Sequence, residues 1–286
     1  MNPPGADSPL GRQDLLVAAR AALLDALEAL EGHRDAVVVI GAQAIYLRAT
    51  ASPVALAEAT KDSDLAIDPR VLANEPLIED VMMRARFYPN AISGQPGAWM
   101  NPAGIPVDLM VPEGVAGPGG PTTRGARIPP HSRRATRRAA GLEAALIDYD
   151  EIEVSALDAA DGRAYRVRVA GLAALLVAKL HKIGERAHST PDRLIDKDAH
   201  DLYRILVAAA TEPLATTLNA LAGDDIAGDA TQTAIGFLRE LFAAGPDATG
   251  SVMAGRADEG VGDPALVSES VAILAADLVA ALEGRP

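Results

Sequence analysis

Three aspartates on two short segments form the pattern of a cation site. Residues 60–68 read TKDSDLAID, and residues 105–111 read IPVDLMV. Side chains of an extended strand alternate between its two faces, so Asp62 and Asp64 share one face. Asp108 follows the same alternation in the second segment. If the two strands are neighbours in a sheet, the three carboxylates converge, and they repel one another unless positive charge lies among them.

Carboxylates grouped in this way suit a divalent cation. Oxygen ligands favour Mg²⁺ or Mn²⁺, and Mg²⁺ commonly binds through one or two carboxylates together with substrate phosphates. A calcium loop does not fit, because it requires Asp or Asn at Ala66 and glycine at Ile67. We interpret Asp62, Asp64 and Asp108 as candidate metal ligands. The simpler alternative is a solvated acidic strand, because an isolated Asp-x-Asp is common.

A small-residue turn precedes the acidic strand. The segment 36–40, AVVVI, is short and β-branched and is typical of a buried strand, and Gly41-Ala42 follows it before a segment that reads as a helix. Small residues at such a turn let backbone amides approach a phosphate closely. Gly41 and Ala42 are therefore candidate nucleotide-binding residues.

A lysine lies inside an apolar stripe in the C-terminal half. The pattern of residues 171–187 predicts a helix whose leucine stripe surrounds Lys179. Burying an ammonium without a partner is costly, so Lys179 either extends to solvent along its aliphatic stem or reaches an anionic partner between domains. The next helix places Asp201 at the margin of its packed face. The alternative for Asp201 is a surface ion pair with Lys197 or Arg204.

One stretch is strongly basic. Residues 124–138, RGARIPPHSRRATRR, hold six arginines, one histidine and no acidic residue, whereas the whole chain has a formal net charge of −13. A charge run of this kind is either a solvated loop or a phosphate-binding patch on an otherwise acidic protein.

Composition excludes several classes of protein. The chain has 286 residues and no cysteine, which leaves no disulfides and no thiolate metal sites. Aromatic residues make up 3%, which disfavours a surface that stacks single-stranded bases, and the acidic balance disfavours non-specific nucleic-acid binding by the whole surface. We find no N-terminal signal pattern and no apolar run of the roughly 18–20 residues that a membrane span needs. We therefore expect a cytoplasmic protein without a membrane partner.

Periodicity places these residues on a mixture of strands and helices. We predict strands at 36–40, 62–68, 105–111 and 165–170, and helices at 13–31, 75–86, 171–187 and 193–210. The Gly/Pro-rich stretch 112–125 is the best boundary in the chain. We accordingly predict a first domain at 1–123 and a mainly helical second domain at 124–286.

The order of these motifs resembles a known family. A buried strand, Gly-small, a helix, Thr-x-Asp-x-Asp-Leu and the "VDLM" aspartate are followed by "LLVAKLHKIGER" and "KDAHDLYRIL". Over roughly 36–210 the chain resembles the AbiEii/MenT-type nucleotidyltransferases, a branch of the DNA polymerase β-like superfamily that includes toxins of toxin–antitoxin systems. The resemblance implies an α/β (α+β) fold, with a polymerase-β-like catalytic domain built on a mixed sheet and a mainly helical C-terminal domain.

The resemblance also implies roles for individual residues. Asp62 and Asp64 would bind Mg²⁺ or Mn²⁺, and Asp108 would complete the acidic triad. Lys179 would contact the nucleoside triphosphate, and Asp201 would be an active-site carboxylate of the second domain.

Thr60 and the Gly41-Ala42 turn stand at the positions of the nucleotide-binding residues in the family pattern. The family usually has Gly-Gly or Gly-Ser where this chain has Gly41-Ala42, so a serine hydroxyl contact to phosphate would be missing here.

The implied reaction is transfer of a nucleoside monophosphate from an NTP to an acceptor hydroxyl on RNA, such as a tRNA end, or on a protein. A toxin-like enzyme of this kind would have a cognate antitoxin as a partner. The arginine run favours RNA as the acceptor, whereas the negative net charge of the chain disfavours RNA binding. Two alternatives stay open. The first is a nucleotidyltransferase that acts on a small, antibiotic-type molecule, which predicts a deep acidic pocket. The second is a catalytically degenerate nucleotide- or partner-binding protein, which the departure from the family pattern at Ala42 favours.

Overall fold

Short apolar runs form the strands of one open mixed sheet. The computed structural model describes residues 12–49, 62–120 and 122–284. Its strands are β1 Val37–Ile40, β2 Ser63–Ile67, β3 Tyr88–Pro89, β4 Ala98–Met100, β5 Pro106–Pro112, β6 Arg137–Ala139, β7 Tyr149–Ser155 and β8 Ala164–Ala170. The β-branched residues of β1 are buried on both faces, which places this strand in the middle of the sheet.

The strand order decides which strand ends meet. The order is β3-β4-β5-β2-β1-β8-β7, and β6 pairs with β5 beyond the end of β4. Strand β2 runs antiparallel to β1 and parallel to β5, and β8 runs parallel to β1. The ends of β1 and β8 and the starts of β2 and β5 therefore share one edge of the sheet.

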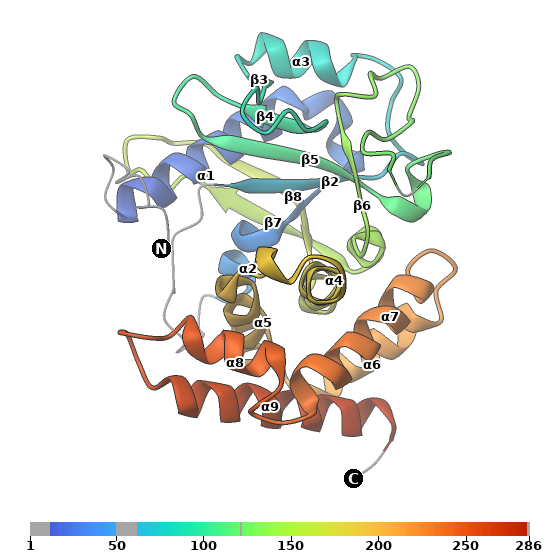
Figure 1. The fold of residues 1–286 in the computed structure, drawn as a ribbon. Helices are drawn as coiled ribbons and strands as arrows, with labels where there is room; N and C mark the ends of the chain where they lie inside the picture. The colour runs from blue at the N-terminus through green and yellow to red at the C-terminus, as the bar shows by residue number, and fades with distance from the viewer. Residues whose placement is uncertain (1–11, 50–61, 121, 285–286) are drawn as a thin grey trace.

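Helices cover both faces of the sheet (Figure 1). Helices α1 (Arg12–Ala29) and α3 (Ile78–Arg84) lie on one side, and α2 (Gly41–Arg48) and α4 (Leu172–Ser189) lie on the other. The hydroxyl of Ser63 donates a hydrogen bond to the carbonyl of Ala19 on α1, at 3.2 Å. Because side chains alternate along β2, Asp64 faces away from α1, toward the side of α2 and α4.

The C-terminal region consists of helices (Figure 1). They are α5 Asp196–Ala208, α6 Thr211–Ala222, α7 Gly228–Leu238, which continues as a π-helical turn at Arg239–Ala243, α8 Thr249–Arg256 and α9 Pro264–Leu282. Helix α4 packs on both α5 and α7 and so joins the sheet to this region. Short 3₁₀ turns occur at Glu31–Ala36, Glu113–Val115, Glu143–Leu146 and Pro191–Arg193.

Helix α9 is unusually apolar. An 18-residue window of this helix has a mean hydropathy of 1.9 and, by length and composition alone, would suffice to cross a membrane, so the expectation that no apolar run is long enough was wrong on that criterion. One face of α9 packs against α6 and α8, through buried residues such as Val271 and Leu278. Leu266 and Ile273 on the opposite face are exposed. A single helix of this kind does not establish a membrane partner.

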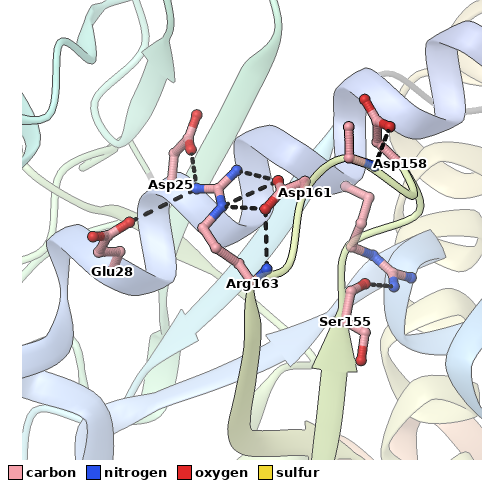
Figure 2. Close-up of polar contacts among 8 residues, drawn as sticks. Asp25, Glu28, Ser155, Asp158, Asp161 and Arg163 are labelled. Carbon is pink, nitrogen blue, oxygen red and sulfur yellow. Dashed lines mark hydrogen bonds and ion pairs between the residues drawn. The ribbon is translucent and has the colours of Figure 1, made fainter.

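Charged side chains fasten the β7–β8 hairpin to α1 (Figure 2). The guanidinium of Arg163 donates to Asp161 at 2.7 Å and to Asp25 of α1 at 2.5 Å. Arg20, also on α1, donates to the carbonyl of Ser155 at 3.0 Å. The far strands of the sheet are thus tied to the helix that covers its centre.

The mixed α/β class, the open mixed sheet and the helical C-terminal region confirm the coarse prediction from sequence. Strands β6, β7 and β8 all follow residue 123 and join the same sheet, so the wholly helical part begins at Leu172. The sequence prediction contained no strand at Arg137–Ala139 or Tyr149–Ser155.

Candidate active site

Two of the three predicted carboxylates lie side by side. Strands β2 and β5 are parallel neighbours, and their register pairs Asp64 with Asp108. Both side chains are partly buried and, at paired positions, point to the same face of the sheet. Asp62 is exposed just before β2, on the same face by alternation. The condition for the carboxylates to converge, that the two strands are neighbours, is therefore met.

The carboxylate of Asp64 is under electrostatic strain. Burial and the negative charge of Asp108 raise the pKa of Asp64 to about 6. The charge of Asp62 adds to this rise, and the positive charges of Lys182 and Lys179 oppose it. Within the described residues, no side chain donates a hydrogen bond to the Asp64 carboxylate. A cation placed beside it would favour the ionised carboxylate and so offset both causes of the raised pKa.

Asp108, by contrast, has a direct counter-ion. The Nη2 atom of Arg137, on β6, lies 2.8 Å from Oδ2 of Asp108. The Nη1 atom of the same guanidinium donates to Gln95 at 3.0 Å. Neither Arg137 nor Gln95 was predicted as a site residue from sequence. The arginine run was noticed, but nothing local in it indicates which arginine faces a carboxylate.

Gly41 brings the start of α2 against Asp64. Strand β1 ends at Ile40, which is paired with Asp64 across the antiparallel ladder. Gly41 has φ +68°, and a Cβ at this position would lie 2.1 Å from Oδ2 of Asp64. Only glycine fits this backbone and this contact. Within the described residues no side chain caps the first turn of α2, which begins at the acidic edge and includes the buried Ala42, so its amides are left for another partner.

The remaining predicted nucleotide-binding residue, Thr60, lies outside the described residues. Gln43, next to Ala42, accepts a hydrogen bond from Arg20 of α1 at 3.1 Å. This buried contact fixes the turn that begins with Gly41.

Lys179 is buried and paired. Its Nζ lies 2.7 Å from Oδ2 of Asp201 and 2.9 Å from Oδ1 of Asp198, both on α5. All three residues are less than 10% exposed. Burial lowers the pKa of the Lys179 ammonium, but the charges of Asp201 and Asp198 outweigh burial and raise it above its ordinary value. Of the two alternatives for Lys179, the structure shows the one with an anionic partner, and α5 supplies that partner.

Two further cations on α4 extend this group. Lys182 and Arg186 contact Asp198 at 2.8 and 3.2 Å. Burial would raise the pKa of Asp198, but the charges of Lys179 and Lys182 hold it well below its usual range. Lys182 and Arg186 were not predicted as site residues. Their positions three and seven residues after Lys179, on the same helix face, were the available signal.

The arginine run divides into two groups. Arg137 contacts Asp108, and Arg138 donates to the carbonyls of Ala116 and Gly117, at 3.2 and 2.6 Å. Within the described part of the chain, four arginine side chains of the run are exposed and have no partner: Arg124, Arg127, Arg133 and Arg134. Two open hollows of about 230 and 270 Å³ border the segment around Arg127.

The residues present fit a divalent cation, although they are not gathered into a ready-made cage. Across the described ranges, no three His, Cys, Asp or Glu side chains already have an arrangement that could hold a metal ion. The donors at this edge are carboxylate oxygens, which hard divalent cations prefer. The glycine at position 41 keeps free the space beside Asp64 that a Cβ would fill.

Comparison with known proteins gives no family. No model of a protein family matches the chain. Searches of curated proteins and of solved structures likewise give no significant match.

Proposed function

We propose that this protein is a metal-dependent nucleotidyltransferase with a polymerase-β-like catalytic core, of the AbiEii/MenT type that the sequence resembles. The observation that carries the proposal is the register of β2 and β5, which sets Asp64 beside Asp108 and against the first turn of α2. The cationic face of α4 acts on the same carboxylate. Paired acids, a helix N-terminus and lysines together suit a metal–triphosphate ligand.

Each group has a part in that chemistry. Asp64 and Asp108, with Asp62, would hold Mg²⁺ or Mn²⁺. When bound, the cation would neutralise charge on the triphosphate and make the acceptor hydroxyl more acidic. The amides at Gly41 and Ala42 would donate to phosphate oxygens.

Lys179 retains a donor for the nucleotide. An ammonium has three N–H donors, and Asp198 and Asp201 accept two of them. The third can meet a phosphate oxygen while the two carboxylates hold the ammonium in a fixed direction. The side chain of Lys182 is about half exposed, at 45%, and would supply a second, more mobile charge. Asp201 then acts by positioning Lys179.

The acceptor that the surface favours is RNA. The four exposed arginines are cations without partners within the described residues, on a protein of net charge −13. Arginines in such a group bind phosphate backbones. A protein acceptor would not require them, and neither would a small-molecule substrate. We place the enzyme in the cytoplasm, as a toxin-like protein with a cognate antitoxin as its partner.

The experiment that tests the proposal is pyrophosphate release. The purified protein would be incubated with Mg²⁺ and each NTP in turn, with total RNA, with protein extract, with an aminoglycoside or without an acceptor. The proposal predicts release that requires Mg²⁺, one preferred NTP and RNA, and that is lost in Asp108→Asn. Release with the aminoglycoside alone would favour the small-molecule alternative. No release under any condition would favour a nucleotide- or partner-binding protein.

A further inference from the structure

Arg137 contacts one of the two carboxylate oxygens of Asp108, a candidate metal ligand. Its Nη2 lies 2.8 Å from Oδ2 of Asp108 and also contacts the sulfur of Met110 at 3.1 Å. The Nη1 atom is held by Gln95 at 3.0 Å. The two side chains of this ion pair are 23% and 22% exposed, so the contact is sheltered without being sealed from solvent.

The backbone around Arg137 is held close to β5. Strand β6 pairs with β5 in a register that sets Arg137 opposite Met110. Gly97 directly precedes β4, next to the point where β6 begins to pair with β5, and it has φ +72°. A Cβ at this position would lie 2.5 Å from the backbone nitrogen of Arg137 and 2.3 Å from the carbonyl oxygen of Leu109. This close approach requires glycine. The backbone of Arg137 is therefore fixed, and only its side chain can leave Asp108.

We propose that Arg137 is an internal competitor for the divalent cation and that it couples cation binding to triphosphate binding. This inference rests on the proposed function. The guanidinium already holds Oδ2 of Asp108, so a cation that uses this carboxylate must share it with an existing counter-ion or displace that counter-ion. A triphosphate arriving with the cation offers the guanidinium a new anionic partner, because arginine binds phosphate through two parallel donors.

The consequence is cooperative loading. The cation alone binds weakly, triphosphate alone meets the repulsion of Asp64 and Asp62, and the two together relieve both conflicts. Coupling of this kind is reciprocal, so triphosphate strengthens cation binding by the same factor as the cation strengthens triphosphate binding. The protein would therefore take up metal with its substrate and stay largely metal-free without it.

The test measures Mn²⁺ binding by electron paramagnetic resonance, with and without inorganic triphosphate as a probe that carries no base. The variants are Arg137→Gln and the matched control Arg84→Gln, which removes an exposed arginine of α3 with the same change of net charge. Gln95→Ala is a second variant, which frees the guanidinium without removing its charge. Circular dichroism verifies that each variant is folded.

Wild-type protein should bind Mn²⁺ weakly alone and much more tightly with triphosphate. Arg137→Gln should bind Mn²⁺ alone at least about tenfold more tightly, since a unit charge within a few ångströms is removed, and triphosphate should then add less. Gln95→Ala should shift the Mn²⁺ affinity in the same direction, and Arg84→Gln should behave as wild type.

Two results would overturn the inference while leaving the proposed function in place. They are unchanged Mn²⁺ affinity in Arg137→Gln and an equal gain of affinity in Arg84→Gln. If neither wild type nor any variant binds Mn²⁺, with or without triphosphate, the proposed function itself fails.

Discussion

Replacing Asp64 by asparagine should stabilise the ligand-free protein, and only above a certain pH. The pKa of Asp64 is raised from an ordinary 3.8 to about 6, first by burial and then by the charge of Asp108. A carboxyl group with a raised pKa in the folded state binds its proton more tightly there than in the unfolded chain. Wild-type protein therefore loses stability as the pH rises from about 4 to about 6, and asparagine, which does not ionise, removes that loss.

The magnitude follows from the shift. About two pKa units correspond to about 3 kcal/mol at roughly 1.4 kcal/mol per unit, and the partial exposure of Asp64 makes this an upper value. Asp64→Asn should equal wild type in free energy of unfolding below about pH 4 and exceed it by about 2–3 kcal/mol above about pH 7. Adding Mg²⁺ together with inorganic triphosphate should narrow this difference in stability, because the pair binds wild type and not Asp64→Asn.

The assay is urea denaturation of both proteins across this pH range, read by circular dichroism. Asp225→Asn is the matched control, because it makes the same substitution at an exposed position. The reasoning is refuted if the difference between Asp64→Asn and wild type does not change with pH, or if Asp64→Asn is the less stable protein at pH 7 and above.

Three other substitutions test the site and its surroundings. Lys179→Met should lower the free energy of unfolding by about 3 kcal/mol, because the buried carboxylate of Asp201 loses the cation that it contacts. Adding Asp201→Leu should recover stability in thermal melts without recovering transfer, and a stable single variant would contradict this. Gly41→Ala should lower the free energy of unfolding by about 2 kcal/mol, because alanine disfavours the positive φ and its Cβ clashes with Asp64. The loss should be smaller when Gly41→Ala is combined with Asp64→Gly, and denaturation of the single and double variants measures the difference. Replacing the four exposed arginines by serine, at Arg124, Arg127, Arg133 and Arg134, should weaken RNA binding. The log–log dependence of affinity on salt should flatten by about one unit of slope per lost contact. An unchanged slope in filter binding would show that the segment is a solvated loop.

The parts of the site that could be predicted from the sequence are those that depend on periodicity within a single strand or helix. Alternation within β2 and β5 placed Asp64 and Asp108 on equivalent faces, and the apolar run before Gly41 predicted β1. The stripe around Lys179 predicted that its ammonium is buried or paired. Each of these patterns lies within one element, where neighbouring residues determine the direction of the side chain.

The parts that sequence did not predict depend on contacts between distant segments. Arg137 meets Asp108 across 29 residues and an irregular loop, on a strand of three residues that is too short for a periodic signal. Strand β7 has mostly exposed or half-exposed side chains because it lies at the sheet edge, so it lacks an apolar face. The choice of Asp198 and Asp201 as partners of Lys179 needs the packing of α5 on α4, which no single helix specifies.

The position of the label after transfer tests the central claim most directly. The protein would be incubated with Mg²⁺, total RNA and each NTP labelled at either the α or the γ phosphate, beside the Asp64→Asn variant. Nucleotidyl transfer predicts that the α label enters RNA from one preferred NTP, that the γ label leaves as pyrophosphate, and that Asp64→Asn does neither. Entry of the γ label into an acceptor, or equal transfer by Asp64→Asn, would contradict the account.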